Sequence, residues 1–443
     1  MVSAPATRWQ RNPPRRVARS SGLRKNLAWS LAGNATYAGM QWATVVVIAR
    51  TGNTEMVGRF SLALAVTAPI TLLAAMSLRT VFVTDPSRQC SFGDYLRVRL
   101  TSMLLAFIAI AAVSLHFDHQ TRDVILVVGI AKTIDGIGDM LVGVFQKMND
   151  MRRIAMSSIL NGTLTTGLVA VSLLTTSSIT IACWGSVLAS TLSSIVYCSV
   201  ALRRTASRSE AADIREFPIP VDPRSRLVRS RALVLTALPL GLAASISSAT
   251  WNVPRYVLGA ETSITTLGIF SAISYIPTVI NIAAAALAQN LLPKLTNMRN
   301  AGEGKRARQL VTRILVLAAA MSLVLSLLSY IFAATLLNAV YGHEYAQHAG
   351  LLTLLMATTT AGAAGFVLDA ALSAQRRFRG QLAANAFACL VCSAFSFSLI
   401  PRAGIVGAGI AVAGMTFALL TIKLALFIIS ARQPLESESS RSG

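Results

Sequence analysis

The chain has 443 residues, of which 54% are hydrophobic and only 13% charged, and its mean hydropathy is +0.60. A soluble domain would carry about twice that share of charged residues, so soluble enzymes and soluble binding modules are excluded. The net charge of +22 would suit nucleic acid, but its distribution along the chain indicates a membrane topology instead. No nucleic-acid partner is therefore expected.

The predicted elements are almost all apolar helices. A basic tail over residues 1–26 is expected to be disordered, and after it apolar stretches of about 20 residues, the length that crosses a bilayer as a helix, recur to the end. The predicted fold class is an all-α polytopic membrane protein. Its twelve predicted spans cover residues 27–49, 60–78, 98–115, 124–146, 154–174, 179–202, 232–250, 264–289, 314–337, 349–371, 381–400 and 404–430.

An arginine- and proline-rich linker at residues 203–231 divides the spans six and six. The predicted units are a bundle over 27–202, a bundle over 232–430 and a tail over 431–443. Most Lys and Arg fall in the loops and tails on one side, which the positive-inside rule assigns to the cytoplasm together with both termini. The outer segments hold only Arg50, Arg59, Arg122, Arg255 and Arg402.

A short sequence pattern occurs once in each half. Arg50 is followed by Gly58-Arg59-Phe60-Ser61, and Arg255 is followed by Gly268-Ile269-Phe270-Ser271. Because six spans is an even number, two such halves would have the same orientation and be related by a parallel pseudo-two-fold axis along the membrane normal. Chance similarity between apolar helices is the competing explanation.

Polar side chains recur on one face of several spans. In the first span they follow steps of three and four residues, and the seventh span repeats the arrangement, which keeps each set on one helical face. Serines and threonines there fit helix–helix hydrogen bonding. Asn34, Gln41 and Asn252 are expected to line a substrate cavity.

The fourth span carries three charges, which are costly in a bilayer. Lys132, Asp135 and Asp139 share one face, and pairing of Lys132 with Asp135 would leave Asp139 as a spare carboxylate. Two interpretations stay open, namely coupling to H⁺ or Na⁺ and a neutralised lock between helices. Asp369 in the tenth span is a weaker counterpart for ion coupling and is expected to pair with Arg376 or Arg377.

Arg50 and Arg255 lie near the outer ends of spans one and seven, and Arg79 follows span two. Two guanidiniums facing one cavity would suit a pyrophosphate, which arginine binds in bidentate geometry. Snorkelling to the membrane interface is the simpler alternative. No catalytic constellation, metal-ligand cluster or cofactor motif is evident, so an enzyme, a metal site and a cofactor are not expected.

Several segments together resemble the polysaccharide (O-antigen and exopolysaccharide) flippases, which are Wzx-like members of the multidrug/oligosaccharidyl-lipid/polysaccharide exporter superfamily. The resemblance extends over about residues 27–430 and is carried by residues 252–261, 267–275, 57–65, 95–99 and 341–345. It implies two six-helix bundles that form a V and alternate between inward and outward openings. Arg50, Arg79 and Arg255 match the cationic central cavity of such proteins.

The resemblance implies a flippase in the bacterial cytoplasmic membrane that moves an undecaprenyl-pyrophosphate-linked oligosaccharide to the outer leaflet for surface polysaccharide biosynthesis. A polysaccharide polymerase and assembly proteins are the implied partners. The alternatives are a drug/cation antiporter of the same superfamily, a membrane-bound oligosaccharide polymerase, or a non-transporting scaffold. The outer-end arginines disfavour the antiporter, and the short outer loops disfavour the polymerase.

Overall fold

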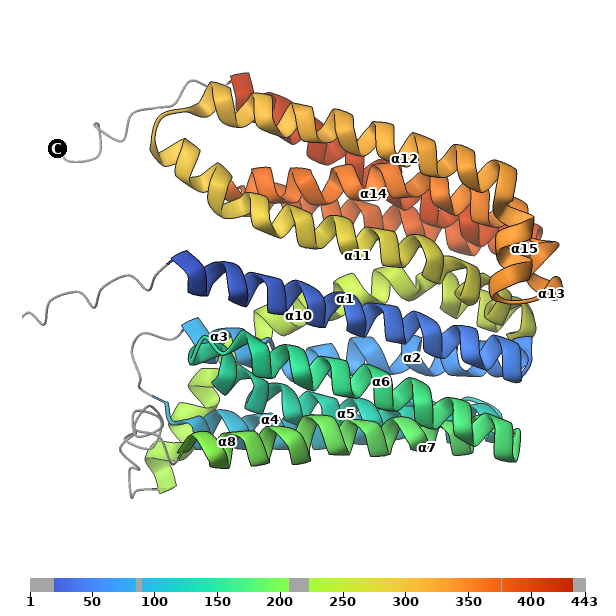
Figure 1. The fold of residues 1–443 in the computed structure, drawn as a ribbon, viewed down its shortest axis with the longest axis horizontal. Helices are drawn as coiled ribbons and strands as arrows, with labels where there is room; N and C mark the ends of the chain where they lie inside the picture. Colours follow the sequence, from blue (N-terminus) through green and yellow to red (C-terminus); the bar gives the residue numbers. More distant parts are fainter. Residues whose placement is uncertain (1–19, 85–89, 207–222, 376, 433–443) are drawn as a thin grey trace, which may run out of the picture.

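A computed structural model describes residues 20–84, 90–206, 223–375 and 377–432, and every regular element in these ranges is helical (Figure 1). Most of the expected tails and of the linker at 203–231 lies outside the described residues. The N-terminal half consists of α1 (Ser20–Thr51), α2 (Thr54–Ala75), α3 (Leu78–Thr84), α4 (Phe92–Ser114), α5 (His119–Lys147), α6 (Met151–Thr176), α7 (Ile179–Ser190), the π-helix η1 (Thr191–Tyr197) and α8 (Cys198–Ala206). The C-terminal half consists of α10 (Pro223–Glu261), α11 (Ile264–Asn300), α12 (Gly304–Val340), α13 (His343–Ala346), α14 (Ala349–Ala374) and α15 (Phe378–Arg432).

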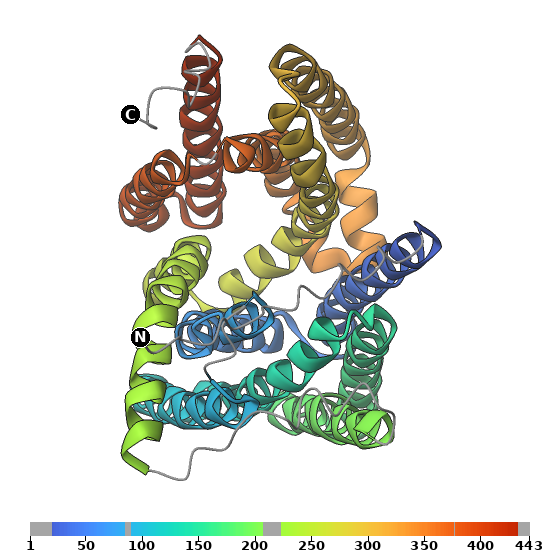
Figure 2. The same cartoon turned by 90° about the vertical axis from the view of Figure 1, so that its left-hand side faces the viewer.

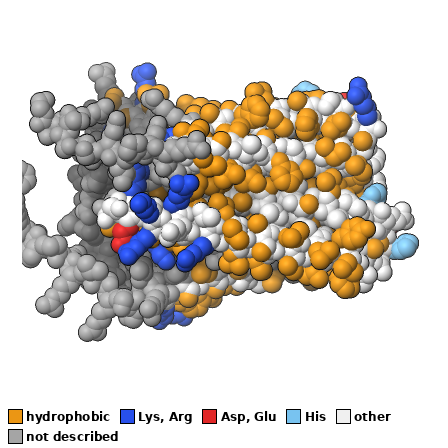
Figure 3. All heavy atoms as spheres, turned by 90° about the horizontal axis from the view of Figure 1, so that it is seen from above, with side chains coloured by type: hydrophobic (Ala, Val, Ile, Leu, Met, Phe, Trp, Pro, Cys, Tyr) orange, Lys and Arg blue, Asp and Glu red, His pale blue; other side chains and the backbone are white. Residues whose placement is uncertain are grey.

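The helices form a membrane protein. Within the described residues, nine helices are long and apolar enough to cross a bilayer. The face seen in Figure 3 carries a broad apolar band, with Lys and Arg gathered toward one end of the molecule and histidines at the other. We call these the basic end, where α1 begins and α15 ends, and the histidine end. α15 is not one continuous helix, because Gly404 has φ 51° and ψ −125°, a conformation open to glycine that kinks the chain.

Local sequence signals explain where the key helices begin. Asn53 caps α2 by accepting a hydrogen bond from the Met56 amide, and Ser263 caps α11 in the same way. α4 starts with a capping box in which Ser91 and Asp94 bond each other's backbone amides. α2 and α11 both start at the histidine end, and the capping residue of each lies five residues before the glycine of the repeated pattern.

The two halves meet closely where α2 and α11 cross. A Cβ built on Gly268 would overlap the carbonyl oxygen of Thr54, and one built on Gly58 would overlap that of Ile264. Only glycine permits this approach of two helix backbones. Nearby, the Trp42 indole donates to the Tyr341 hydroxyl at 2.8 Å, and that hydroxyl donates to the Ala272 carbonyl at 2.8 Å. These contacts join the halves at the histidine end.

α10 connects both halves. Its first turns pack Leu233 and Ala237 into a hydrophobic cluster of the N-terminal half, whereas farther along, the Thr250 carbonyl accepts a hydrogen bond from Cys392 in α15. Figure 2, viewed from the basic end, shows α10 running alongside the N-terminal half before it reaches the C-terminal half. Pro239 and Pro254 lie inside this helix, where each removes a backbone hydrogen bond.

Candidate functional site

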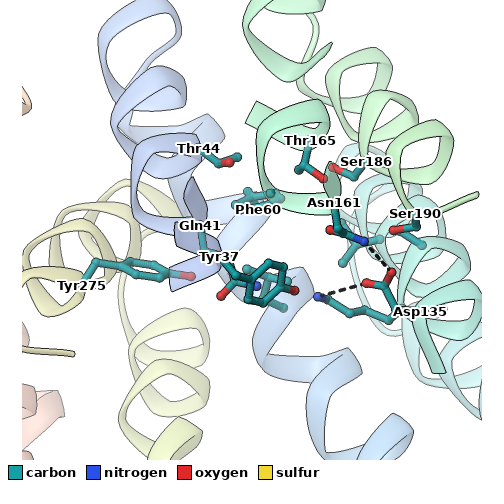
Figure 4. Close-up of a pocket in the computed structure, with 15 residues that line it drawn as sticks. Tyr37, Gln41, Thr44, Phe60, Asp135, Asn161, Thr165, Ser186, Ser190 and Tyr275 are labelled. Carbon is teal, nitrogen blue, oxygen red and sulfur yellow. Dashed lines mark hydrogen bonds and ion pairs between the residues drawn. The ribbon is translucent and has the colours of Figure 1, made fainter. Parts of the chain in front are cut away.

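An internal cavity of about 60 Å³ lies in the N-terminal half and extends to the boundary with the C-terminal half. This is room for a few water molecules. Tyr37 and Gln41 from α1, Lys132 and Asp135 from α5, and Tyr275 from α11 are among its lining residues. In Figure 4, Tyr275 points from the C-terminal half toward Tyr37. The cavity is therefore completed by a residue from the other half of the molecule.

Asp135 is held by three polar neighbours. The Lys132 ammonium lies 3.8 Å from one carboxylate oxygen, as the three-residue spacing predicts. The other oxygen accepts from the Asn161 amide at 3.0 Å, a contact drawn in Figure 4, and from the Ser194 hydroxyl at 3.2 Å. Ser194 belongs to η1, and π-helical turns often occur at functional sites. Both charges of the pair remain partly exposed, so they are accessible to the cavity.

Asp139 is not a spare carboxylate, and this expectation was wrong. Its two oxygens lie 2.9 Å from Arg79 and 3.2 Å from Arg99. The Arg99 side chain is 1% exposed, and two of its nitrogens have no hydrogen-bond partner among the described residues. Burying an arginine requires an opposite charge beside it, so Asp139 neutralises a buried cation.

Arg79 is occupied by the same network. It is the second residue of α3, the short helix that follows α2, and besides the Asp139 contact its Nε donates to the Gln146 side chain at 2.7 Å. Met76 and Ser77, both in the left-handed region, end α2 and redirect the chain so that α3 can place Arg79 there. An arginine held in this way has fewer donors for a substrate than the sequence suggested.

Arg255 has a different environment. It is partly buried in α10, and its Nη1 donates to the Asn252 side-chain oxygen at 3.0 Å. Tyr275 lies within electrostatic range of both Arg255 and Lys132. Within the described part of the chain, no carboxylate pairs with Arg255. The boundary between the halves thus holds a cation without a counter-charge, and a second cation, Lys132, nearby.

Arg50 lies at the histidine end rather than in the cavity. Its guanidinium donates to the carbonyls of Asn338 and Val340, each at 2.9 Å, and to that of Ala339. These are the last carbonyls of α12, which carry the negative end of the helix dipole. Arg50 therefore links α1 to the C-terminal half as a helix cap.

The three residues predicted to line a substrate cavity lie in three different environments. Gln41 lines the N-terminal cavity, and Asn252 orients Arg255. Asn34 is exposed on α1, seven residues before Gln41, toward the basic end. The structure brings Gln41, Lys132 and Asp135 together in one cavity, and leaves Arg50 and Asp139 outside it.

A second cavity of about 230 Å³ lies between α10, α11, α14 and α15 of the C-terminal half. Asp369 lines it and pairs with Lys423 of α15 at 2.8 Å. The sequence predicted pairing with Arg376 or Arg377, of which Arg376 lies outside the described residues, and it did not predict the Lys423 contact. The reason is tertiary, since α15 places a buried lysine against α14 from 54 positions away.

Several participants were missed in the sequence. Asn161 lies among serines and threonines in its span, and Lys423 is the one charge within the span 404–430, where a charged residue inside hydrocarbon is the available signal. Arg99 was noticed only as part of a motif, although it is the most deeply buried charge of the Asp139 network. Tyr275 was noticed in the same way. No sequence spacing connects these residues to the sites they complete.

Comparison with known proteins agrees with the fold. The family model described as "Polysaccharide biosynthesis protein" matches residues 23–299, which is more than half of the chain. The chain belongs to this family. The capsular polysaccharide biosynthesis protein CapF of Staphylococcus aureus is 23% identical over 388 residues, covering 88% of this chain and 95% of that protein.

Solved structures of multidrug transporters share the fold. An inward-facing transporter of the MATE family, in the MOP superfamily, has a TM-score of 0.68 at 13% identity and covers 91% of this chain and 98% of its own. The outward-facing conformation of a MATE-family transporter has a TM-score of 0.61 at 12% identity, with coverages of 93% and 95%. This member of the polysaccharide biosynthesis protein family therefore has the fold of the MATE-family transporters.

Proposed function

We propose that the protein is a flippase that moves an undecaprenyl-pyrophosphate-linked oligosaccharide from the cytoplasmic to the outer leaflet of a bacterial cytoplasmic membrane. The observation that carries this proposal is Arg255, a partly buried cation within a membrane helix that has no carboxylate partner among the described residues. A cation in that setting is costly unless an anion accompanies it during the working cycle. A pyrophosphate supplies that anion with bidentate geometry.

The two halves are proposed to alternate around this site. The hydrogen bonds from Trp42 and Arg50 join the halves at the histidine end, and the higher similarity is to the inward-facing relative. This supports an assignment of the structure to the inward-facing state. Substrate would enter between the halves from the cytoplasm, with its prenyl chain in lipid, and leave after the histidine end opens. No covalent step is involved, so the protein is not proposed to be an enzyme.

The topology supports the same function. We propose twelve spans in two related six-helix bundles. Besides the nine helices that are long and apolar enough to cross a bilayer, α1 and α5 are long enough to do so, which gives eleven. α15 is one of the nine, and its division at Gly404 into two crossings gives the twelfth. At 1.5 Å per residue, a 55-residue α15 would be about 80 Å long, far more than a bilayer core. An even number of spans places both termini on the same side of the membrane. The positive-inside rule assigns that side to the cytoplasm.

Ion coupling is proposed to rest on Lys132 and Asp135 rather than on Asp139. Both members of that pair face the cavity, whereas Asp139 is committed to two arginines. Transport that is indifferent to collapse of both the pH and Na⁺ gradients would refute coupling. It would leave the flippase proposal intact.

The test is deletion of the protein in its native host, followed by extraction of lipid-linked intermediates. We expect a complete undecaprenyl-pyrophosphate repeat unit to accumulate on the cytoplasmic face. A drug/cation antiporter, the alternative that shares the fold, would leave these intermediates unchanged. Loss of a polymerase would instead leave single repeat units on the outer face, so the three functions give three different results.

A further inference from the structure

The cavity of the C-terminal half is lined by a buried hydrogen-bond acceptor that has no donor among the described residues. The Asn281 side-chain oxygen is buried, and no donor among the described residues reaches it. The packing of α14 preserves its position, because a Cβ built on Gly362 would lie 2.6 Å from that oxygen. Buried acceptors without a donor are destabilising, which points to a ligand hydroxyl or amide that supplies the missing hydrogen bond.

The charges in this cavity already balance. Asp369 lies 2.8 Å from the Lys423 ammonium, and the Lys423 side chain is 6% exposed. The carboxylate therefore has its counter-ion within the protein, and the cavity does not require an inorganic cation. The pair instead offers a fixed acceptor and a fixed donor to a neutral, polar ligand.

The remaining walls are apolar and aromatic. Trp251, 43% exposed, and Phe366 line the cavity together with small residues such as Ala361 and Gly365. Aromatic faces next to a few convergent polar groups suit a ligand with both an apolar face and hydroxyls, as a pyranose has. The volume of about 230 Å³ is below that of cavities for drug-sized ligands, and so it fits a single sugar unit.

The location links this cavity to Arg255. Trp251 and Arg255 are four residues apart on α10, so their side chains are neighbours one helical turn apart. In a lipid-linked oligosaccharide, the first sugar is attached directly to the pyrophosphate. We infer that the cavity lined by Trp251, Asn281 and Asp369 is a subsite for the sugar unit nearest the pyrophosphate. This inference rests on the proposed function.

The test compares binding of two lipids to full-length, detergent-purified protein, namely undecaprenyl pyrophosphate and the same lipid carrying the oligosaccharide. Trp251→Ala and Asn281→Leu are expected to weaken binding of the sugar-bearing lipid about tenfold, the loss expected for one buried polar or stacking contact. Binding of the bare lipid should not change. Trp184→Ala is the matched control, because Trp184 is 51% exposed on α7, outside both cavities.

Three results would contradict the subsite. These are equal weakening for both lipids, unchanged binding of both lipids, and wild-type protein that binds the bare lipid as tightly as the sugar-bearing one. Wild-type protein that binds neither lipid would refute the flippase function itself, and the subsite with it. Each variant should also unfold at the same midpoint temperature as the wild-type protein, which checks that it is folded.

Discussion

Replacing Gly268 by alanine should open the histidine end of the molecule. In the closed arrangement, the new methyl group would overlap the Thr54 carbonyl oxygen, and the Gly58 amide nitrogen would lie 2.8 Å from it. Both obstacles are backbone atoms of α2, so no side-chain rotation can relieve the contact. The strain exists only while α2 and α11 are packed together, and it disappears when the halves separate at this end.

The size of the effect follows from the cost of overpacking. Forcing one extra methyl group into a packed contact destabilises by roughly 1–3 kcal/mol. Since each 1.4 kcal/mol changes an equilibrium about tenfold, the closed population should fall by a factor of roughly 5 to 150 relative to the open one. Gly167→Ala is the matched control, because a Cβ on that helical glycine of α6 meets no atom within 4 Å.

Thiol labelling in cells provides the assay. Ser61 lies on α2, three residues after Gly58, and is 3% exposed, so Ser61→Cys places a nearly isosteric thiol beside the crossing. A membrane-impermeant maleimide applied from outside should label this cysteine faster when Gly268→Ala is added and at the original rate when Gly167→Ala is added. The chain without Ser61→Cys measures the background from its own cysteines. Equal labelling rates for Ser61→Cys alone, with Gly268→Ala and with Gly167→Ala would refute the reasoning.

Three further predictions concern the charged residues. Arg255→Ala should abolish substrate transport and Arg255→Lys should retain part of it, because a point charge replaces a bidentate donor; full activity of Arg255→Ala at normal expression in a complementation assay would remove Arg255 from the mechanism. Asp139→Asn should lower the free energy of unfolding by roughly 3 kcal/mol, since it leaves the buried Arg99 without a counter-charge; an unchanged melting temperature would contradict this. Arg50→Gln should increase the Ser61→Cys labelling only slightly, because exposed contacts contribute little; complete loss of transport with normal expression would instead indicate a direct substrate role.

The repeated pattern predicted two matching helix starts and was a poor guide to the arginines. Asn53 and Ser263 each lie five residues before the glycine that meets the other half, so the two patterns coincide in register. Arg50, however, lies three residues before its cap, and Arg255 lies eight before its own. This difference of more than one helical turn places Arg50 at a helix end and Arg255 inside the bundle. A shared motif thus accompanies two different roles.

Local spacing predicted only the contacts made within one helix. The Lys132–Asp135 pair is an example, since residues three apart on a helix are neighbours. The partners of Asp139 and Asp369 come from other helices, and their identities depend on crossing angles that apolar sequences do not encode in a readable way. The long apolar segments were predictable because bilayer thickness sets their length, and the kink of α15 at Gly404 lies where the sequence predicted one span to end and the next to begin.

The central claim is that Arg255 receives the pyrophosphate of a lipid-linked oligosaccharide during its transfer between leaflets. The most direct measurement uses purified protein in liposomes that hold the undecaprenyl-pyrophosphate-linked oligosaccharide, with an impermeant glycosidase reporting which glycans reach the outer face. We predict rapid loss of the protected glycan fraction with wild-type protein and with Arg402→Ala, which alters an exposed arginine of α15. Arg255→Ala should leave that fraction protected. Protection that persists with wild-type protein, or is lost equally with Arg255→Ala, would contradict the account.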